Sequence, residues 1–280
     1  MTKSFGVIGG DQRSACLARK LAEGGFSVMT WGLSAFGAPN NSPLEHTATA
    51  DTVILPIPLS RGGMLNCAER SLPLEELFSL LAPCQQIFAG GVREDDRLAA
   101  QRHSLTLTDL MAQEDFTVRN VIPTAEGAIE LAMEALPTTL HGTPCLILGF
   151  GRIGKLLSHR LKALGAEVTV SARKREDLAW IDAFGYGGIH SARLAGTLGS
   201  FRVIFNTVPH LLLTRELLSE LRRDCVLIEL ASADGIDRAA AEEAGLRLVN
   251  GRGLPGRTAP ERVADIICSA IMDHRKGEWA

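Results

Sequence analysis

A glycine-rich segment in the second half of the chain has the spacing of a dinucleotide-binding turn. It reads Gly149-Phe-Gly-Arg-Ile-Gly154 and matches the pattern G-x-G-x-x-G. An apolar run precedes it and apolar residues at helical spacing follow it, so it joins a predicted strand to a predicted helix. The first glycine permits a tight turn, the second lets the backbone approach a pyrophosphate, and the third lets helix and strand pack closely. We therefore predict a pyrophosphate site at this helix N-terminus, formed by Gly149, Phe150, Gly151, Arg152, Ile153 and Gly154.

A basic run at the end of the next predicted strand favours NADP over NAD. An NAD-binding domain usually has Asp or Glu about 20 residues after the glycine motif, where it binds the ribose 2′-hydroxyl. This chain has Ser171, Arg173, Lys174 and Arg175 in that region. A guanidinium pairs with a 2′-phosphate through two hydrogen bonds, whereas a carboxylate would repel it. We predict NADP contacts from Ser171, Arg173 and Lys174, with NAD as the other cofactor to consider. The alternative is a solvated loop with no ligand.

Two further loops follow predicted strands of the same half. They are Asn206-Thr207-Val208-Pro209 and Leu230-Ala231-Ser232. Ligands of doubly wound sheets bind at the carboxyl ends of the strands, so these loops are predicted to contact the cofactor near the ribose and nicotinamide. The alternative is a pair of ordinary strand-to-helix turns.

The first half offers candidates for binding a small anion. Gly9-Gly10-Asp11-Gln12-Arg13 follows the first predicted strand, but it lacks the full glycine pattern, so a second dinucleotide is not expected there. Arg13 could hold a carboxylate, and Asp11 could take a proton or orient Arg13. Each also has a purely structural explanation, as a surface arginine and a helix cap.

Three more residues are candidates for the substrate site. Ser60 and Arg61 lie in a loop that follows another predicted strand, and Arg257 lies in the rigid Gly- and Pro-rich segment 251–260. The alternative for each is an exposed loop residue.

The elements that must position these residues alternate along the whole chain. Short apolar runs alternate with helical patterns in both halves, which predicts parallel sheets covered on both faces. The predicted fold class is α/β, with two doubly wound parallel-sheet domains, the C-terminal one a Rossmann NAD(P)-binding domain. We expect a substrate domain at 1–121, a linking helix at 122–139 capped by Thr124, a Rossmann domain at 140–257, and a last helix at 258–280 that packs back on the first domain.

Composition and charge exclude several other classes of protein. The chain has 280 residues, about two domains, with 29 basic and 32 acidic residues and a net charge of −3. This balance argues against a nucleic-acid binder, and the lack of a long apolar run argues against a membrane protein. Six scattered cysteines and seven histidines show no metal-ligand spacing, so no metal is expected. No signal peptide is recognised, so a cytoplasmic location is expected.

The motifs taken together resemble the family of dipicolinate synthase A subunits from spore-forming bacteria. The resemblance covers nearly the whole chain. The stretches that carry it are Val7–Arg13, Ile122–Gly127, Leu148–Gly154, Ser171–Arg173, Asn206–Pro209, Leu230–Ser232 and Gly253–Gly256. The plan of a substrate domain before a nucleotide-binding domain is also similar to 2-hydroxyacid and alanine dehydrogenases.

The resemblance implies an activity, a partner and a location. Dihydrodipicolinate, a cyclic intermediate of the lysine pathway, would be oxidised to pyridine-2,6-dicarboxylate by NADP during sporulation. The family works in the mother cell with the flavoprotein-like B subunit of dipicolinate synthase, and an oligomer is expected. Arg13, Ser60, Arg61 and Arg257 would bind the dicarboxylate. Asp11 and Glu126 are the candidates for the proton acceptor, although Glu126 also suits the first turn of a helix.

Two other functions stay open at this point. One is an NADP-dependent oxo-acid reductase of the shikimate dehydrogenase type, whose NADP-binding turn the Ser-Ala-Arg sequence at 171–173 resembles. No clear Lys/Asp catalytic pair supports it. The other is a non-catalytic NADP-binding protein that needs the B subunit for turnover, because no obvious acid–base pair stands out.

Overall fold

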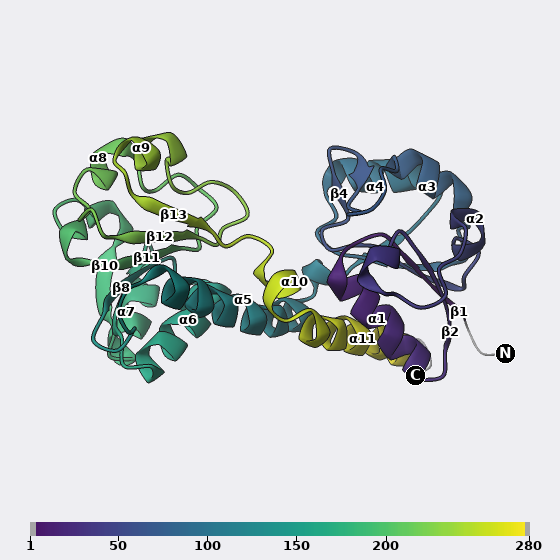
Figure 1. The fold of residues 1–280 in the computed structure, drawn as a ribbon, viewed down its shortest axis with the longest axis horizontal. Coiled ribbons are helices and arrows are strands. Elements are labelled where there is room, and N and C mark those ends of the chain that lie inside the picture. Colours follow the sequence, from purple (N-terminus) through teal and green to yellow (C-terminus); the bar gives the residue numbers. More distant parts are fainter. Residues whose placement is uncertain (1–3, 278–280) are drawn as a thin grey trace. The chain divides into compact units, whose positions relative to one another are not determined.

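The structure, a computed structural model, describes residues 4–277, with side chains through residue 274. The chain divides into two compact units. Unit 1 comprises residues 1–120 and 255–280, and unit 2 comprises residues 121–254. Each unit contains one large parallel sheet flanked by helices (Figure 1).

The sheet of unit 1 has five parallel strands in the order β2-β1-β3-β6-β7. Strand β2 lies on one side of β1, and β3 and the later strands lie on the other side. The loops after β1 and β3 therefore meet at the switch point of the sheet. The strands are β1 Ser4–Ile8, β2 Ser27–Trp31, β3 Thr52–Ile54, β6 Gln86–Ala89 and β7 Leu107–Asp109, and a small hairpin pairs β4 Ser60–Arg61 with β5 Met64–Leu65. The helices are α1 Gln12–Glu23, α2 Leu44–Thr47, α3 Leu74–Leu80, α4 Glu94–Arg102 and α11 Pro260–Gly277.

Side chains alternate between the two faces of this sheet and form a core on each. Phe5 and Val7 of β1 join the cluster that α1 and α11 complete, while Ile8 joins the cluster under α3 and α4. This alternation is the period of two expected for a strand. Because both faces are covered, the strands read as apolar runs in the sequence. The last helix, α11, packs against α1 through buried residues such as Val263 and Ile267.

The sheet of unit 2 has six parallel strands in the order β10-β9-β8-β11-β12-β13, which is the order of a Rossmann domain. The strands are β8 Pro144–Leu148, β9 Glu167–Ala172, β10 Gly187–His190, β11 Val203–Asn206, β12 Val226–Glu229 and β13 Arg247–Asn250. The helices that follow them are α6 Arg152–Ala163, α7 Arg175–Ala183, α8 Arg215–Leu218 and α9 Arg238–Glu243. The two sheets confirm the predicted α/β fold class with two doubly wound domains.

One predicted helix begins earlier than expected. The helix predicted to start at Thr124 is α5, which runs Glu114–Ala135, with Pro123 and Thr124 inside it. The Pro-Thr-x-Glu pattern resembles a helix start, but Phe116 is fully buried in the unit 1 core. Burial of this upstream turn therefore favours helix beyond the local capping signal. The Gly- and Pro-rich segment 251–260, predicted as a loop, also contains a short helix, α10 Leu254–Thr258.

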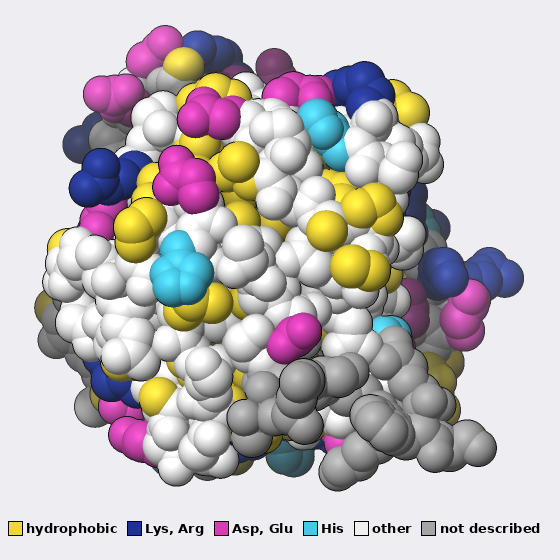
Figure 2. All heavy atoms as spheres, turned by 90° about the vertical axis from the view of Figure 1, so that its right-hand side faces the viewer, with side chains coloured by type: hydrophobic (Ala, Val, Ile, Leu, Met, Phe, Trp, Pro, Cys, Tyr) yellow, Lys and Arg dark blue, Asp and Glu magenta, His cyan; other side chains and the backbone are white. Residues whose placement is uncertain are grey.

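Within residues 4–277, no helix is both long enough and apolar enough to cross a membrane. The face of unit 1 drawn in Figure 2 carries basic and acidic side chains of mixed sign, mostly toward its margins. Hydrophobic side chains are scattered over that face among uncharged ones.

A candidate dinucleotide site and a candidate anion site

The glycine turn after β8 has the geometry that a bound pyrophosphate needs. Gly149 has a positive φ of 99°, and a Cβ there would lie 2.6 Å from Thr207 Oγ1. A Cβ on Gly154 would clash with the carbonyl oxygen of Gly149, so this glycine lets α6 pack on the turn. Gly151 is exposed, and a Cβ on it would meet no atom within 4 Å. The space beside Gly151 and the N-terminus of α6 therefore fit a dinucleotide phosphate.

The turn after β9 presents its basic residues to solvent. Arg173, Lys174 and Arg175 are all exposed, and Lys174 lies 4.0 Å from Glu176. Arg173 has no ion pair with any residue of the described chain. Ser171 is different, because it is fully buried and its Oγ lies 2.9 Å from Ser191 Oγ. The exposed arginines and lysine are therefore the groups available to a ribose 2′-phosphate, and the contact from Ser171 stays a prediction.

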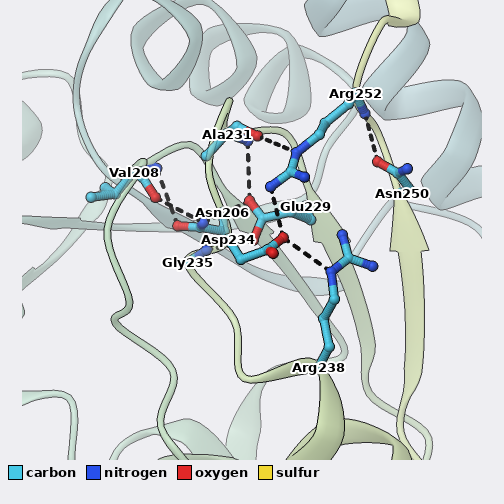
Figure 3. Close-up of polar contacts among 9 residues, drawn as sticks. All are labelled: Asn206, Val208, Glu229, Ala231, Asp234, Gly235, Arg238, Asn250 and Arg252. Atoms are coloured by element: carbon cyan, nitrogen blue, oxygen red, sulfur yellow. Dashed lines mark hydrogen bonds and ion pairs between the residues drawn. The ribbon is translucent and has the colours of Figure 1, made fainter. Parts of the chain in front are cut away.

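The loops after β11 and β12 are fixed by a buried carboxylate, Glu229, at the centre of Figure 3. Its Oε1 accepts hydrogen bonds from Asn206 Nδ2 at 2.7 Å and Ala231 N at 3.1 Å, and its Oε2 accepts one from Gly235 N at 2.9 Å. Asn206 also accepts a hydrogen bond from Val208 N at 3.1 Å. The carboxylate therefore links the ends of the neighbouring strands β11 and β12 and fixes the loops that follow them.

Ion pairs on the solvent side restrain the loop after β12 as well. Arg252 donates to the carbonyl oxygen of Ala231 at 2.8 Å and to Asp234 at 2.7 Å, and Arg238 donates to Asp234 at 3.0 Å (Figure 3). These hydrogen bonds, first that of Arg238 and then that of Arg252, lower the pKa of Asp234. Asp234 therefore stays ionised near neutral pH and restrains the loop that contains Leu230, Ala231 and Ser232.

These contacts change how the predicted loop residues would reach a cofactor. The side chain of Asn206 is buried and occupied by Glu229, and Thr207 donates to the carbonyl oxygen of Leu148 at 2.8 Å. Leu230 and Ala231 are buried, while Pro209 and Ser232 are exposed. Glu229 was missed in the sequence because it reads as the end of an apolar run. An acid among buried strand residues is the signal that could have marked it.

In unit 1, Asp11 and Arg13 form a tightly bound pair at the switch point of the sheet. Arg13 Nε donates to Asp11 Oδ1 at 2.9 Å, and Arg13 Nη2 donates to Asp11 Oδ2 at 2.7 Å and to the carbonyl oxygen of Ile57 at 2.6 Å. Asp11 also caps α1 by accepting from the backbone N–H of Arg13. The pair lines a small hollow with apolar residues that include Leu17 and Ile267. Asp11 thus orients Arg13, one of the two roles predicted for it.

The loop after β3 places Ser60 and Arg61 differently from each other. Ser60 is buried and its hydroxyl donates to Asp96 at 2.6 Å, whereas Arg61 is exposed on the small hairpin. Ser60 also accepts a hydrogen bond from Arg93 at 2.8 Å. Arg93 and Asp96 were not singled out in the sequence, because their contact with Ser60 joins residues more than 30 positions apart.

The two remaining candidates, Glu126 and Arg257, belong to different units. Glu126 lies on α5 in unit 2 and pairs with Arg160 of α6. Arg257 is an exposed residue of α10 that lies in the unit 1 part of the chain. Their predicted roles in catalysis and substrate binding stay predictions.

Comparison with known protein families identifies the class of protein that this fold and turn define. Residues 98–245 match the family described as D-isomer specific 2-hydroxyacid dehydrogenase, NAD binding domain. L-alanine dehydrogenase shares the fold, with a TM-score of 0.67 at 13% identity over 97% of this chain and 88% of that chain. The chain is an NAD(P)-dependent oxidoreductase that carries a nicotinamide dinucleotide-binding domain of this family.

The N-terminal half, and the chain as a whole, match proteins of one particular enzyme. Residues 4–111 match the family described as the N-terminal domain of the dipicolinate synthase A subunit. The dipicolinate synthase A subunit of Bacillus subtilis is 29% identical over 95% of this chain and 93% of the relative. The crystal structure of the Bacillus halodurans A subunit superimposes with a TM-score of 0.87 at 29% identity, covering 98% of this chain and 97% of that one. The chain is therefore similar to dipicolinate synthase A subunits along nearly its whole length.

Proposed function

We propose that this chain oxidises dihydrodipicolinate to pyridine-2,6-dicarboxylate with NADP as hydride acceptor. The observation that carries the proposal is the match at the N-terminal half. The nucleotide-binding half is shared with many dehydrogenases, whereas residues 4–111 match a domain found in the A subunit of dipicolinate synthase. The substrate-binding half of a dehydrogenase sets its substrate, so this is the informative part.

The reaction removes a hydride from a ring carbon and a proton from the ring, and the product becomes aromatic. When bound, NADP supplies the hydride acceptor. The turn at 149–154 would hold its pyrophosphate, and Arg173 and Lys174 would hold its 2′-phosphate. Glu229 and Asn206 keep the loops after β11 and β12 in place, so the binding surface is formed before the cofactor arrives.

Unit 1 would supply most of the groups that act on the substrate. Arg13 offers a guanidinium that Asp11 already orients, and Ser60, Arg61 and Arg257 are the further predicted substrate residues. Asp11 and, from unit 2, Glu126 are the proposed proton acceptors. Both carboxylates are paired with arginines, Asp11 with Arg13 and Glu126 with Arg160.

The proposal includes a partner and a setting. The relatives are named as A subunits, which implies a further kind of subunit. We propose that this chain works with the flavoprotein-like B subunit in the cytoplasm of the mother cell of a spore-forming bacterium, and that it forms an oligomer. The small dicarboxylate is the substrate class, and neither nucleic acid nor a membrane is expected as a partner.

A substrate panel tests the proposed function. The aldolase of the lysine pathway would generate the cyclic substrate in place, and reduced nicotinamide would be followed by its absorbance. The proposal predicts turnover with this substrate and none with a panel of oxo acids and NADPH. Reduction of an oxo acid without oxidation of the cyclic substrate would instead establish the oxo-acid reductase.

A further inference from the structure

We propose that Arg93 is a second substrate-binding arginine, and that Arg13 and Arg93 together bind the two carboxylates of a dicarboxylate. This inference rests on the proposed function and names two residues that distinguish its substrate from a monocarboxylate. Neither the position of Arg93 in the sequence nor its neighbours indicate that it binds a ligand. The contacts of its side chain indicate this role.

Arg93 is held in place by two buried polar groups. Its Nη2 donates to Ser60 Oγ at 2.8 Å, and its Nε lies 3.7 Å from Asp96 Oδ2. Ser60 and Asp96 are 5% and 2% exposed, and Ser60 gives its only proton to Asp96 at 2.6 Å. The buried carboxylate is therefore satisfied by Ser60 and by the backbone N–H of Arg93 at 3.0 Å. Burying the carboxylate of Asp96 is costly unless it is paired. Its contacts with the backbone and side chain of Arg93 therefore hold this arginine in one position.

The backbone on either side of Arg93 is fixed as well. Asp109, at the end of β7, accepts hydrogen bonds from Gly91 N at 3.0 Å and from Val92 N at 3.1 Å. Gly90 packs directly on Ile57, because a Cβ on it would lie 2.6 Å from Ile57 Cγ1. The segment before Arg93 therefore has little freedom, and the arginine is positioned before any ligand binds.

The guanidinium of Arg93 still has donors to offer. Its side chain is 53% exposed, and the described residues accept only one hydrogen bond from its five N–H groups. Asp96 is the only carboxylate of the described residues with which it pairs. Arg13 is more enclosed, at 12% exposure, and both N–H groups of its Nη1 lack an acceptor within the described residues. Each arginine thus has at least two N–H groups for a carboxylate.

One loop places both guanidinium groups. Arg13 binds the carbonyl oxygen of Ile57, and Arg93 binds the hydroxyl of Ser60, three residues further along the loop after β3. Three residues of extended chain span at most about 11 Å. Both arginines lie in unit 1, at the carboxyl edge of its parallel sheet, where ligands of such sheets bind. Two cations anchored on the same short loop suit a small rigid molecule with a carboxylate at each end.

Ser60 has a different role in this arrangement from the one predicted. Its single proton goes to Asp96 and one lone pair goes to Arg93, so it acts through Arg93 and is a positioning residue. Arg61, its neighbour, lies on the exposed edge of the hairpin and has no such support.

Calorimetric titration with two ligands tests the proposal without requiring turnover. Pyridine-2,6-dicarboxylate and pyridine-2-carboxylate would be titrated into the wild-type chain and into Arg93→Gln. We expect the variant to lose about tenfold or more in affinity for the dicarboxylate and less than about threefold for the monocarboxylate. The matched control is Arg102→Gln at the C-terminus of α4, the helix that Arg93 precedes. Arg102 is an exposed arginine paired with Glu75, and its replacement should change neither affinity.

Two further variants separate ligand binding from folding. Arg93→Lys keeps the charge but not the planar fork, so it should recover part of the lost dicarboxylate affinity. Ser60→Ala should lower dicarboxylate affinity while NADP affinity, a property of unit 2, stays unchanged. If the wild type binds the dicarboxylate and all Arg93 and Ser60 variants bind it equally well, the two-arginine site is overturned. If the wild type binds no pyridine dicarboxylate, the proposed function fails, and this inference fails with it.

Discussion

At the scale of single residues, Arg173 is the side chain on which the choice of cofactor depends. It is exposed after β9 and has no carboxylate partner within the described residues. We expect Arg173→Asp to weaken NADP binding by about tenfold or more, and NAD binding far less, because the new carboxylate repels only a 2′-phosphate. Dissociation constants for both cofactors measure the effect. Arg223→Asp, another exposed site in unit 2, is the control, and an equal loss for both cofactors would exclude the 2′-phosphate contact.

The two candidate proton acceptors can be tested by isosteric replacement. Asp11→Asn keeps a helix cap at α1, and Glu126→Gln keeps the shape of the side chain. Removal of a general base lowers kcat by about a hundredfold or more. We expect a loss of this size in at least one of the two variants, with the affinity for NADP retained. Full kcat in both would remove Asp11 and Glu126 from the mechanism.

Two buried thiols give the folded protein a pH dependence at the alkaline end. Burial raises the pKa of Cys145 and of Cys225 to about 12, against 9.0 for an ordinary thiol. The folded state therefore holds protons that the unfolded state releases, so stability is full below about pH 9 and falls as pH rises toward 12. Denaturant unfolding at several pH values would show the decline. Alkylation near neutral pH should label the exposed Cys84 and spare both buried thiols, and rapid labelling of Cys145 or Cys225 in the folded protein would contradict this.

At the scale of elements, the glycine turn separates a structural requirement from a ligand requirement. Gly154→Ala would clash with the backbone of Gly149, so we expect it to lower the free energy of unfolding. Gly151→Ala meets no atom within 4 Å, so it should fold as stably as the wild type and still lose cofactor affinity. Thermal melting and cofactor titration of the two variants make the comparison. Undiminished cofactor binding by Gly151→Ala would mean that the pyrophosphate lies elsewhere.

Central strands were predictable from the sequence, and the two edge strands β7 and β10 were not. The strands β8 and β11 are buried on both faces, so each reads as an apolar run. The edge strand β10 contains two glycines and is partly exposed, and β7 at the edge of the other sheet is half-buried throughout. Neither has an apolar pattern to recognise. The start of α5 was missed for a related reason, because burial of Phe116 in a distant core extends the helix upstream.

The candidate cofactor site could be proposed from the sequence because its residues are contiguous. The turn at 149–154 and the basic run at 173–175 are short motifs with fixed roles. Glu229 and Arg93 are different, because Glu229 binds Asn206, 23 positions away, and Arg93 binds Ser60, 33 positions away. Such contacts exist only once the sheet brings strand ends together, so the acid at the end of an apolar run was the one local signal for Glu229, and no local pattern marked Arg93.

At the scale of the whole molecule, the chain combines two sheets of different strand order. Unit 1 has the order β2-β1-β3-β6-β7, and unit 2 has the Rossmann order. Each places its loops at the carboxyl edge of a parallel sheet, one around arginines and the other around the glycine turn. Division of substrate binding and cofactor binding between two such units is the expected plan of a dehydrogenase. We therefore expect dicarboxylate affinity and NADP affinity to respond to separate sets of substitutions.

The stoichiometry of the reaction tests the proposed oxidation. The purified chain, with and without the B subunit, would receive enzymatically generated dihydrodipicolinate and NADP, and both products would be quantified. We expect one NADPH formed for each pyridine-2,6-dicarboxylate, with Gly151→Ala inactive under the same conditions. Pyridine dicarboxylate formed without NADPH, or no product even when the B subunit is present, would contradict it.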